Sequence, residues 1–212
     1  MTENLHWLGH ATFRWDGSKT VYFDPWNIPS ASKKADIVLI THEHFDHFSK
    51  PDIAKISDED TVVVAGEAVT CQLKAQRELL RDILTVSPGD SIDLSGVRIK
   101  AVASYNIGKS YHTKASKKMG FIVTIDGVSI YHAGDTDNIP EIKDVKCDIA
   151  LLPVGGTYTM TAEEAAAAAL AIKPKAAIPM HYGGTAGTPG DGKRFEEFLK
   201  GKVEVKILKR EG

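Results

Sequence analysis

The stretch 41–47 reads Thr-His-Glu-His-Phe-Asp-His and brings three of the chain's eight histidines close to one another and to an aspartate. It follows residues 35–40, whose largely apolar run predicts a buried strand. Loops at the ends of such strands commonly carry functional side chains. If the stretch is extended, His42 and His44 point to the same side, and Asp46 and His47 follow directly. Imidazole nitrogen and carboxylate oxygen suit zinc, iron, manganese or nickel, so the stretch predicts a metal site.

Length and composition indicate an ordinary soluble protein. A chain of 212 residues with 42% hydrophobic content can fill one core, which predicts a single domain spanning 1–212. The net charge of −2 gives no reason to expect nucleic acid or an anionic membrane as a partner, and oligomeric state is left open. Neither a secretory signal nor a membrane-spanning run is visible. Cys71 and Cys147 lack ligand-like neighbours, so we expect buried thiols and a cytoplasmic location.

Strands and helices are predicted in an order that repeats once. Strands are expected at residues 5–8, 11–15, 20–23, 35–40, 61–65, 83–86, 91–94, 97–103, 120–125, 128–132, 149–152, 176–179 and 203–208. Helices are expected at residues 49–57, 67–80, from the capping Thr161 to before Pro174, and near 195–199. Residues 126–127 are Asp-Gly, a strong signal for a two-residue hairpin. The order predicts an α/β sandwich of mixed sheets covered by helices.

Further metal ligands are expected at two other strand ends. Asp135 follows the strand 128–132 after a small Ala-Gly pair, which lets backbone approach an ion closely. His181 stands at the tip of the strand 176–179. Either residue alone would more often be an ordinary polar side chain than a ligand. Their occurrence after strands, together with the stretch 41–47, favours ligands.

These residues carry a resemblance to a known family. The pattern His42-x-His44-x-Asp46-His47, followed by Gly134-Asp135-Thr136 and a strand-terminal His181, resembles the metallo-β-lactamase superfamily. It is most similar to the L-ascorbate-6-phosphate lactonase-like branch of metal-dependent hydrolases, which shows pieces similar to residues 7–11, 24–25, 131–136, 152–155 and 179–182. The resemblance runs from about residue 5 to residue 184. It implies a four-layer αββα sandwich, with two mixed sheets packed face to face and helices outside.

The resemblance also implies a ligand set for two divalent ions, with zinc as the first candidate and manganese, nickel or iron as alternatives. His42 and His44 would bind one ion, Asp46, His47 and His181 the other, and Asp135 would bridge them. The family has a further histidine just after the strand corresponding to 97–103. This chain offers either His112, which we favour, or Asn106 as a weak ligand or substrate contact.

Three more residues are candidates to support the metal ligands or contact the substrate: His10, His132 and Tyr182. A purely structural role beside a turn is an equal alternative for His10 and His132. A metal-held water, oriented by Asp46, would attack an ester, lactone or phosphodiester of a small-molecule substrate. The loop 104–118 carries Lys109, Lys114, Lys117 and Lys118, which would attract an anionic or phosphorylated substrate if they are not simply solvated. Two alternatives stay open: an iron-dependent oxidoreductase on the same fold, and a metal-binding protein without catalysis.

Overall fold

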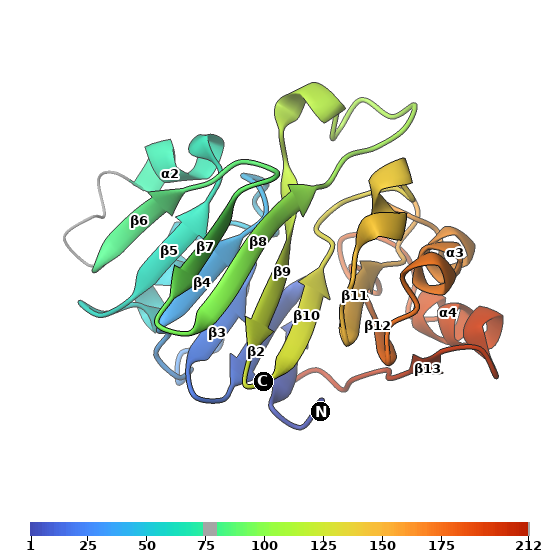
Figure 1. The fold of residues 1–212 in the computed structure, drawn as a ribbon, viewed down its shortest axis with the longest axis horizontal. Helices are drawn as coiled ribbons and strands as arrows, with labels where there is room; N and C mark the ends of the chain where they lie inside the picture. The colour runs from blue at the N-terminus through green and yellow to red at the C-terminus, as the bar shows by residue number, and fades with distance from the viewer. Residues whose placement is uncertain (74–79, 212) are drawn as a thin grey trace. The chain divides into compact units, whose positions relative to one another are not determined.

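Each half of the chain forms one mixed sheet whose strands lie side by side in sequence order (Figure 1). The computed structural model describes residues 1–73 and 80–211. It contains two compact units, one made of Met1–Ser87 with the C-terminal residues from Lys209, the other of Pro88–Leu208. We call them unit 1 and unit 2 and describe each by itself. The α/β class is confirmed, whereas the prediction of a single domain stays a prediction.

Unit 1 contains a six-stranded sheet that is antiparallel in its first half and parallel in its second. The antiparallel strands are β1 (Leu5–Gly9), β2 (Thr12–Asp16) and β3 (Thr20–Phe23). The parallel strands are β4 (Ile37–Ile40), β5 (Val62–Ala65) and β6 (Asp82–Thr85). Helices α1 (Lys50–Ile56) and α2 (Glu67–Leu73) connect the parallel strands. The helix expected over 67–80 is confirmed as far as Leu73, and its residues 74–79 lie outside the described part.

The parallel strands of unit 1 pack against helix α1 through buried apolar side chains. All four residues of β4 are buried, as the continuous apolar run predicts for a strand covered on both faces. Alternate residues Val38 and Ile40 join a buried cluster with Ile53 and Ile56 of α1. The side chain of Ser49 caps α1 by accepting from the backbone N–H of Asp52. The loop that follows β4 therefore starts from a rigid support.

Unit 2 repeats the arrangement with seven strands. Strands β7 (Ser91–Leu94), β8 (Val97–Ala103), β9 (Met119–Ile125) and β10 (Val128–His132) are antiparallel. Strands β11 (Ile149–Pro153), β12 (Ala176–Met180) and β13 (Glu204–Val205) continue in parallel. The connections contain α3 (Ala162–Ile172), α4 (Asp191–Leu199) and two 3-10 helices, η2 (Lys114–Ser116) and η3 (Pro140–Asp144). The last strand is shorter than the expected 203–208, because only two of its residues form ladder pairs with β12.

Local sequence signals explain the hairpin turn and the helix start of unit 2. Asp126 and Gly127 both have positive φ, as the two-residue hairpin turn between β9 and β10 requires. Thr161 and Glu164 form a reciprocal capping box at the start of α3. The alanine-rich α3 buries Ala165 and Ala169, so its small side chains allow close packing.

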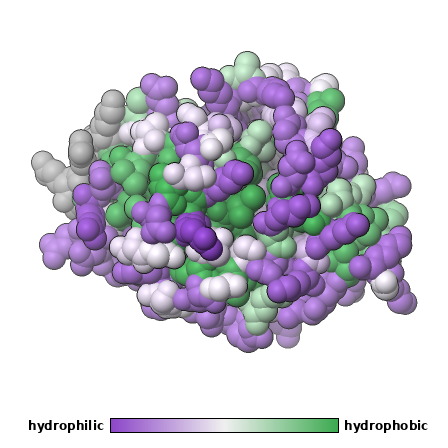
Figure 2. All heavy atoms as spheres, in the orientation of Figure 1, coloured by the Kyte–Doolittle hydropathy of each residue, from purple (hydrophilic) through white to green (hydrophobic). Residues whose placement is uncertain are grey.

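An outer cavity lies on the antiparallel half of the unit 2 sheet. It measures about 290 Å³ and is lined by residues that include Val102, Ile122 and Tyr131. Figure 2 shows hydrophobic side chains gathered over β8 and β9 on the face turned toward the viewer. Burial raises the pKa of Tyr131. Successive strand residues point to opposite faces, so the cavity is on the other face of β10 from His132.

The cysteines differ from the prediction. Cys71 is exposed, because α2 turns Val69, Thr70 and Leu73 inward and leaves Cys71 on its outer side. Cys147 is half-buried, and burial raises the pKa of its thiol to about 12. Within residues 1–73 and 80–211, no helix is both long and apolar enough to cross a bilayer.

Candidate metal centre

The donor side chains follow strand ends in both units. The loop after β4 supplies His42, His44, Asp46 and His47 in unit 1. In unit 2, Asp135 follows β10 and His181 follows β12. Carboxyl ends of parallel strands are the usual place for ligand sites in α/β sheets. Each set of donors is described below within its own unit.

A buried aspartate at the end of β3 organises the donors of unit 1. The Asp24 side chain is fully buried, and its Oδ2 lies 2.6 Å from Nδ1 of His47. Asp24 also accepts hydrogen bonds from the backbone N–H and the hydroxyl of Thr41, both at 2.7 Å. A carboxylate can only accept, so His47 Nδ1 carries the proton and Nε2 carries the lone pair. Sequence reasoning gave Asp24 no role, although Asp-Pro at a strand end marked the place.

The same carboxylate fixes the ring of His42 through Thr41. The Thr41 hydroxyl gives its single proton to Asp24, so it accepts from Nδ1 of His42, which lies 2.9 Å away. The lone pair of His42 is therefore on Nε2 as well. The His42 ring lies 4.6 Å from that of His44 and 4.2 Å from that of His47, between centroids. The loop thus gathers three imidazoles, as the stretch 41–47 predicts.

His10 lies beside Asp46. It occupies the turn between β1 and β2 with φ of 51°, a left-handed conformation that is uncommon for histidine. Its Nε2 is 3.0 Å from Oδ2 of Asp46, and their side chains are 3% and 13% exposed. Donor atoms of His10, Asp46 and His47 all lie within 4.8 Å of one another. Since the carboxylate only accepts, His10 donates to Asp46 and holds it in place.

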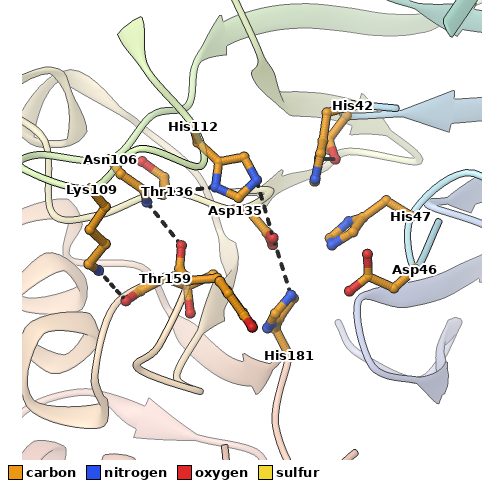
Figure 3. Close-up of polar contacts among 12 residues, drawn as sticks. His42, Asp46, His47, Asn106, Lys109, His112, Asp135, Thr136, Thr159 and His181 are labelled. Atoms are coloured by element: carbon orange, nitrogen blue, oxygen red, sulfur yellow. Dashed lines mark hydrogen bonds and ion pairs between the residues drawn. The ribbon is translucent and has the colours of Figure 1, made fainter. Parts of the chain in front are cut away.

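In unit 2, Asp135 lies between two histidines (Figure 3). Its Oδ2 is 3.2 Å from Nε2 of His181 and 3.7 Å from Nε2 of His112. All three side chains are almost fully buried, at 4%, 2% and 1% exposure. The structure therefore brings together the predicted ligands Asp135 and His181 and the favoured candidate His112.

Asn106 lies behind His112 rather than beside Asp135. Its Oδ1 is 3.0 Å from Nδ1 of His112, and its Nδ2 donates to Oδ1 of Asp137 and to the carbonyl of Tyr158. Both acceptors of Nδ2 are oxygens, so the amide orientation is fixed and Oδ1 must accept from His112. The lone pair of His112 is therefore on Nε2, the atom that faces Asp135. This geometry favours His112 over Asn106 as the ligand.

The end of β12 is shaped by a close approach of two loops. His181 has φ of 57°, which turns the chain directly after the strand. A Cβ on Gly155 would lie 2.3 Å from the carbonyl oxygen of His181, so only glycine fits there. Gly155, in the Pro-Val-Gly-Gly sequence that begins with the last residue of β11, is thereby explained by its packing against the loop that carries His181.

Asp137 anchors the loop that carries His112. Its carboxylate accepts from Nδ2 of Asn106 at 3.2 Å, from the backbone N–H of Ile107 at 2.8 Å and from Nζ of Lys109 at 2.6 Å. Lys109 also donates to the carbonyl of Thr159. Sequence reasoning missed this role, although Asp137 closes the Asp-Thr-Asp run that begins with Asp135.

His132 and Tyr182 each contact a glycine of unit 2, and their predicted role near the metals stays a prediction. Nδ1 of the fully buried His132 accepts from the backbone N–H of Gly134, which supports the turn before Asp135. Tyr182 packs against Gly192 of α4, where a Cβ would lie 2.8 Å from its hydroxyl oxygen. Burial raises the pKa of Tyr182.

Comparison with known proteins identifies the family to which this chain is similar. The family described as the β-lactamase superfamily domain matches residues 4–181, which include every predicted ligand. A UPF0173 metal-dependent hydrolase from Thermoplasma acidophilum is 36% identical, over 97% of this chain and 95% of that protein. The chain belongs to the metallo-β-lactamase superfamily. Within it, the chain belongs to the UPF0173 family, whose members are named metal-dependent hydrolases.

Solved structures agree with the family assignment. A metal-dependent hydrolase from Parabacteroides distasonis, described as putative, is 34% identical with a TM-score of 0.82, covering 97% of this chain and 93% of that one. A diiron β-hydroxylase from Streptomyces venezuelae has a TM-score of 0.75 at 14% identity, covering 96% of this chain and 52% of that one. The latter similarity concerns the fold alone.

Proposed function

We propose that this superfamily member is a hydrolase that uses two divalent metal ions to cleave an ester, lactone or phosphodiester of a small molecule. The observation that carries the proposal is the fixed tautomer of three histidines. In His42, His47 and His112, a hydrogen bond holds Nδ1 as a donor and leaves the lone pair on Nε2. Metal-bound histidines characteristically have such a partner on the second nitrogen. The donor sets of both units therefore fit divalent ions chemically.

The proposed ligands follow the family resemblance. His42 and His44 would hold one ion, and Asp46, His47 and His181 the other, with Asp135 bridging. His112 would complete the first set, and Asn106 would orient it. Zinc suits these nitrogen and oxygen donors best, with manganese, nickel and iron as alternatives.

The chain's own residues have distinct tasks in the proposed reaction. Bound metal ions supply Lewis acidity and a water that is acidic near neutral pH. Asp46, held by the hydrogen bond from His10, would orient that water toward the scissile centre. Asp24 and Asn106 keep the imidazoles in one tautomer, so the site needs no rearrangement before the reaction.

The finer assignments belong to the same proposal. We place the chain in the lactonase-like branch, because residues 131–136 and 179–182 carry the similar pieces. A cytoplasmic location is proposed because both cysteines are free thiols. The iron-dependent oxidoreductase stays the alternative, since an oxygen and imidazole donor set also suits iron. Metal analysis of protein purified without added metal separates these two possibilities.

The decisive test is a screen of esters, lactones and phosphodiesters with zinc, manganese and nickel. We expect turnover of at least one class by the wild type, and loss of that turnover in Asp46→Ala. Thr185→Ala, in the exposed loop after β12, is the matched control and should keep the activity. Near wild-type turnover in Asp46→Ala would overturn the role of Asp46. Absence of turnover in every class, with iron found in the purified protein, would favour the oxidoreductase.

A further inference from the structure

Large apolar side chains are exposed on the segments that surround His112. Ile107 is 57% exposed, Tyr111 54% and Tyr158 37%. The rings of Tyr111 and Tyr158 pack edge to face with their centroids 4.8 Å apart. Exposed apolar groups gathered at one place often mark a binding site.

These side chains are tied to the histidine by hydrogen bonds of the backbone. Asn106 holds the His112 ring through its side chain. Its own backbone is fixed to the same residue, because its N–H donates to the carbonyl of His112 at 2.7 Å. The amide of Asn106 donates to the Tyr158 carbonyl at 3.0 Å. Ile107 is fixed by the bond from its N–H to Asp137. The backbone that carries these apolar side chains is therefore held at a defined place relative to His112.

Most of the lysine side chains of the same loop are paired with carboxylates of the protein or buried. Lys109 pairs with Asp137 at 2.6 Å, and Lys114 pairs with Glu141 at 2.7 Å. The hydrogen bond from Lys114 lowers the pKa of Glu141, so the carboxylate stays charged at neutral pH. Lys118 is buried. Three of the four lysines that would favour an anionic substrate are thus paired or covered.

Unit 1 carries a comparable feature in its own donor loop. Phe45, between the predicted ligands His44 and Asp46, is 67% exposed. Its ring lies edge-on to Trp26, with centroids 6.1 Å apart, and Trp26 in turn contacts His10 at 5.4 Å. Exposed aromatic rings therefore border the donors in each unit.

We propose that Tyr111 and Tyr158 bind an apolar, ring-sized group of the substrate next to the scissile bond, with Ile107 beside them. The substrate class is then an aryl- or alkyl-substituted ester or lactone rather than a phosphorylated one. This inference rests on the proposed hydrolase function, since it needs the metal centre to hold the reacting group. Edge-to-face contact with a substrate ring adds to the area that is removed from water.

The test uses hydroxamates, which chelate metal ions and differ here only in the attached group. The zinc-loaded protein is titrated by calorimetry with acetohydroxamate, phenylacetohydroxamate and succinic monohydroxamate, whose chain ends in a carboxylate. We expect phenylacetohydroxamate to bind about tenfold more tightly than acetohydroxamate. Tyr111→Ala and Tyr158→Ala should remove most of that preference, and Tyr158→Phe should keep it. Phe198→Ala removes an aromatic ring of α4 that is 44% exposed and is the matched control.

The outcomes separate the inference from the proposed function. Equal binding of the acetyl and phenylacetyl compounds would overturn the aromatic site while leaving the metal centre intact. Tightest binding of the carboxylate compound would also overturn it, in favour of an anionic substrate. Failure of the protein to bind any of zinc, manganese, nickel and iron, or of every hydroxamate to bind the metal-loaded protein, would overturn the proposed function and the inference together.

Discussion

The ring orientations of His42, His47 and His112 are each decided by one neighbouring oxygen. For His112 that oxygen is Oδ1 of Asn106, which is itself fixed because Nδ2 donates to Asp137 and Tyr158. If His112 is a ligand and Asn106 only its support, Asn106→Ala should weaken metal binding by about 10–100-fold without abolishing it. His112→Ala should weaken it more. Competition with a chromophoric chelator measures both affinities.

Asn138→Ala, at an exposed position of the following loop, is the control for this series. Its metal affinity should equal that of the wild type. A larger loss for Asn106→Ala than for His112→Ala would mean that Asn106 is the ligand and His112 its support.

At this scale, sequence predicted the donors better than their supports. Residues 41–47 are close in sequence, so their chemistry can be recognised without a structure. Asp24 and Asp137 act over 17 to 31 residues on Thr41, His47 and Asn106, and no local pattern shows such bonds. Their signals were position, since each lies at or beyond a strand end, and for Asp24 the similarity of residues 24–25 to the lactonase-like branch.

Strands and helices position the donors through a few tight contacts. Gly155 allows the loop after β11 to pass the carbonyl of His181, which a Cβ would approach to 2.3 Å. Gly155→Ala should lower the free energy of unfolding by about 1–3 kcal/mol through this overpacking. It should also reduce metal affinity, because His181 has to move. Gly184→Ala is the control, since nothing lies within 4 Å of the Cβ that it adds.

Chemical denaturation of the metal-free variants, followed by metal titration, measures both effects. If Gly155→Ala kept the wild-type free energy of unfolding and metal affinity, the two loops could move apart without loss of stability. That result would contradict the role given to Gly155.

The starts of three strands in unit 2 are joined by Asp148. It accepts from the N–H and hydroxyl of Ser129 on β10, and it pairs with Lys175 before β12 at 2.8 Å. The hydrogen bond from Lys175, followed by those from Ser129, lowers the Asp148 pKa from 3.8 to about 2. The folded pKa lies below the unfolded value, so the stabilisation is present above about pH 4 and is lost as pH falls toward 2.

We expect Asp148→Asn to cost about 1–2 kcal/mol at pH 6, after allowance for the partly exposed carboxylate. The difference from wild type should shrink as pH falls from 4 to 2. Denaturant unfolding of metal-free protein at several pH values measures it. Glu196→Gln, on the exposed side of α4, should show no such pH dependence. A difference that stays constant across this range would contradict the charge-based explanation.

The strands and helices were largely predictable, because alternating or continuous apolar residues mark the strands and capping residues mark the helix starts. Strands β3, β7, β8 and β10 lie where alternation and apolar runs place them, and Ser49 and Thr161 cap helices as their spacing predicts. The 3-10 helix η3 was missed, since its five residues are too few for a periodic signal. Strand β13 is shorter than expected, since only Glu204 and Val205 pair with β12.

At the scale of the whole molecule, metal binding should stabilise the folded chain. Donors come from unit 1, with His42 and His47, and from unit 2, with Asp135 and His181. A ligand that binds only the folded state at one hundred times its dissociation constant stabilises that state by about 2.7 kcal/mol. For a chain of this size we expect the melting temperature to rise by roughly 5–10 °C on adding zinc to metal-free protein.

Hydrogen exchange shows whether both units share this gain. If the two donor sets serve one centre, zinc should slow amide exchange in β4 of unit 1 and in β12 of unit 2 alike. Asp135→Asn changes only a unit 2 donor, and it should diminish the protection of β4 as well as that of β12. Slower exchange confined to one unit would mean that one donor set binds metal alone. The bridging role of Asp135 would then be wrong. A residue that links two ions should affect the amide exchange of the strands that precede both sets of ligands.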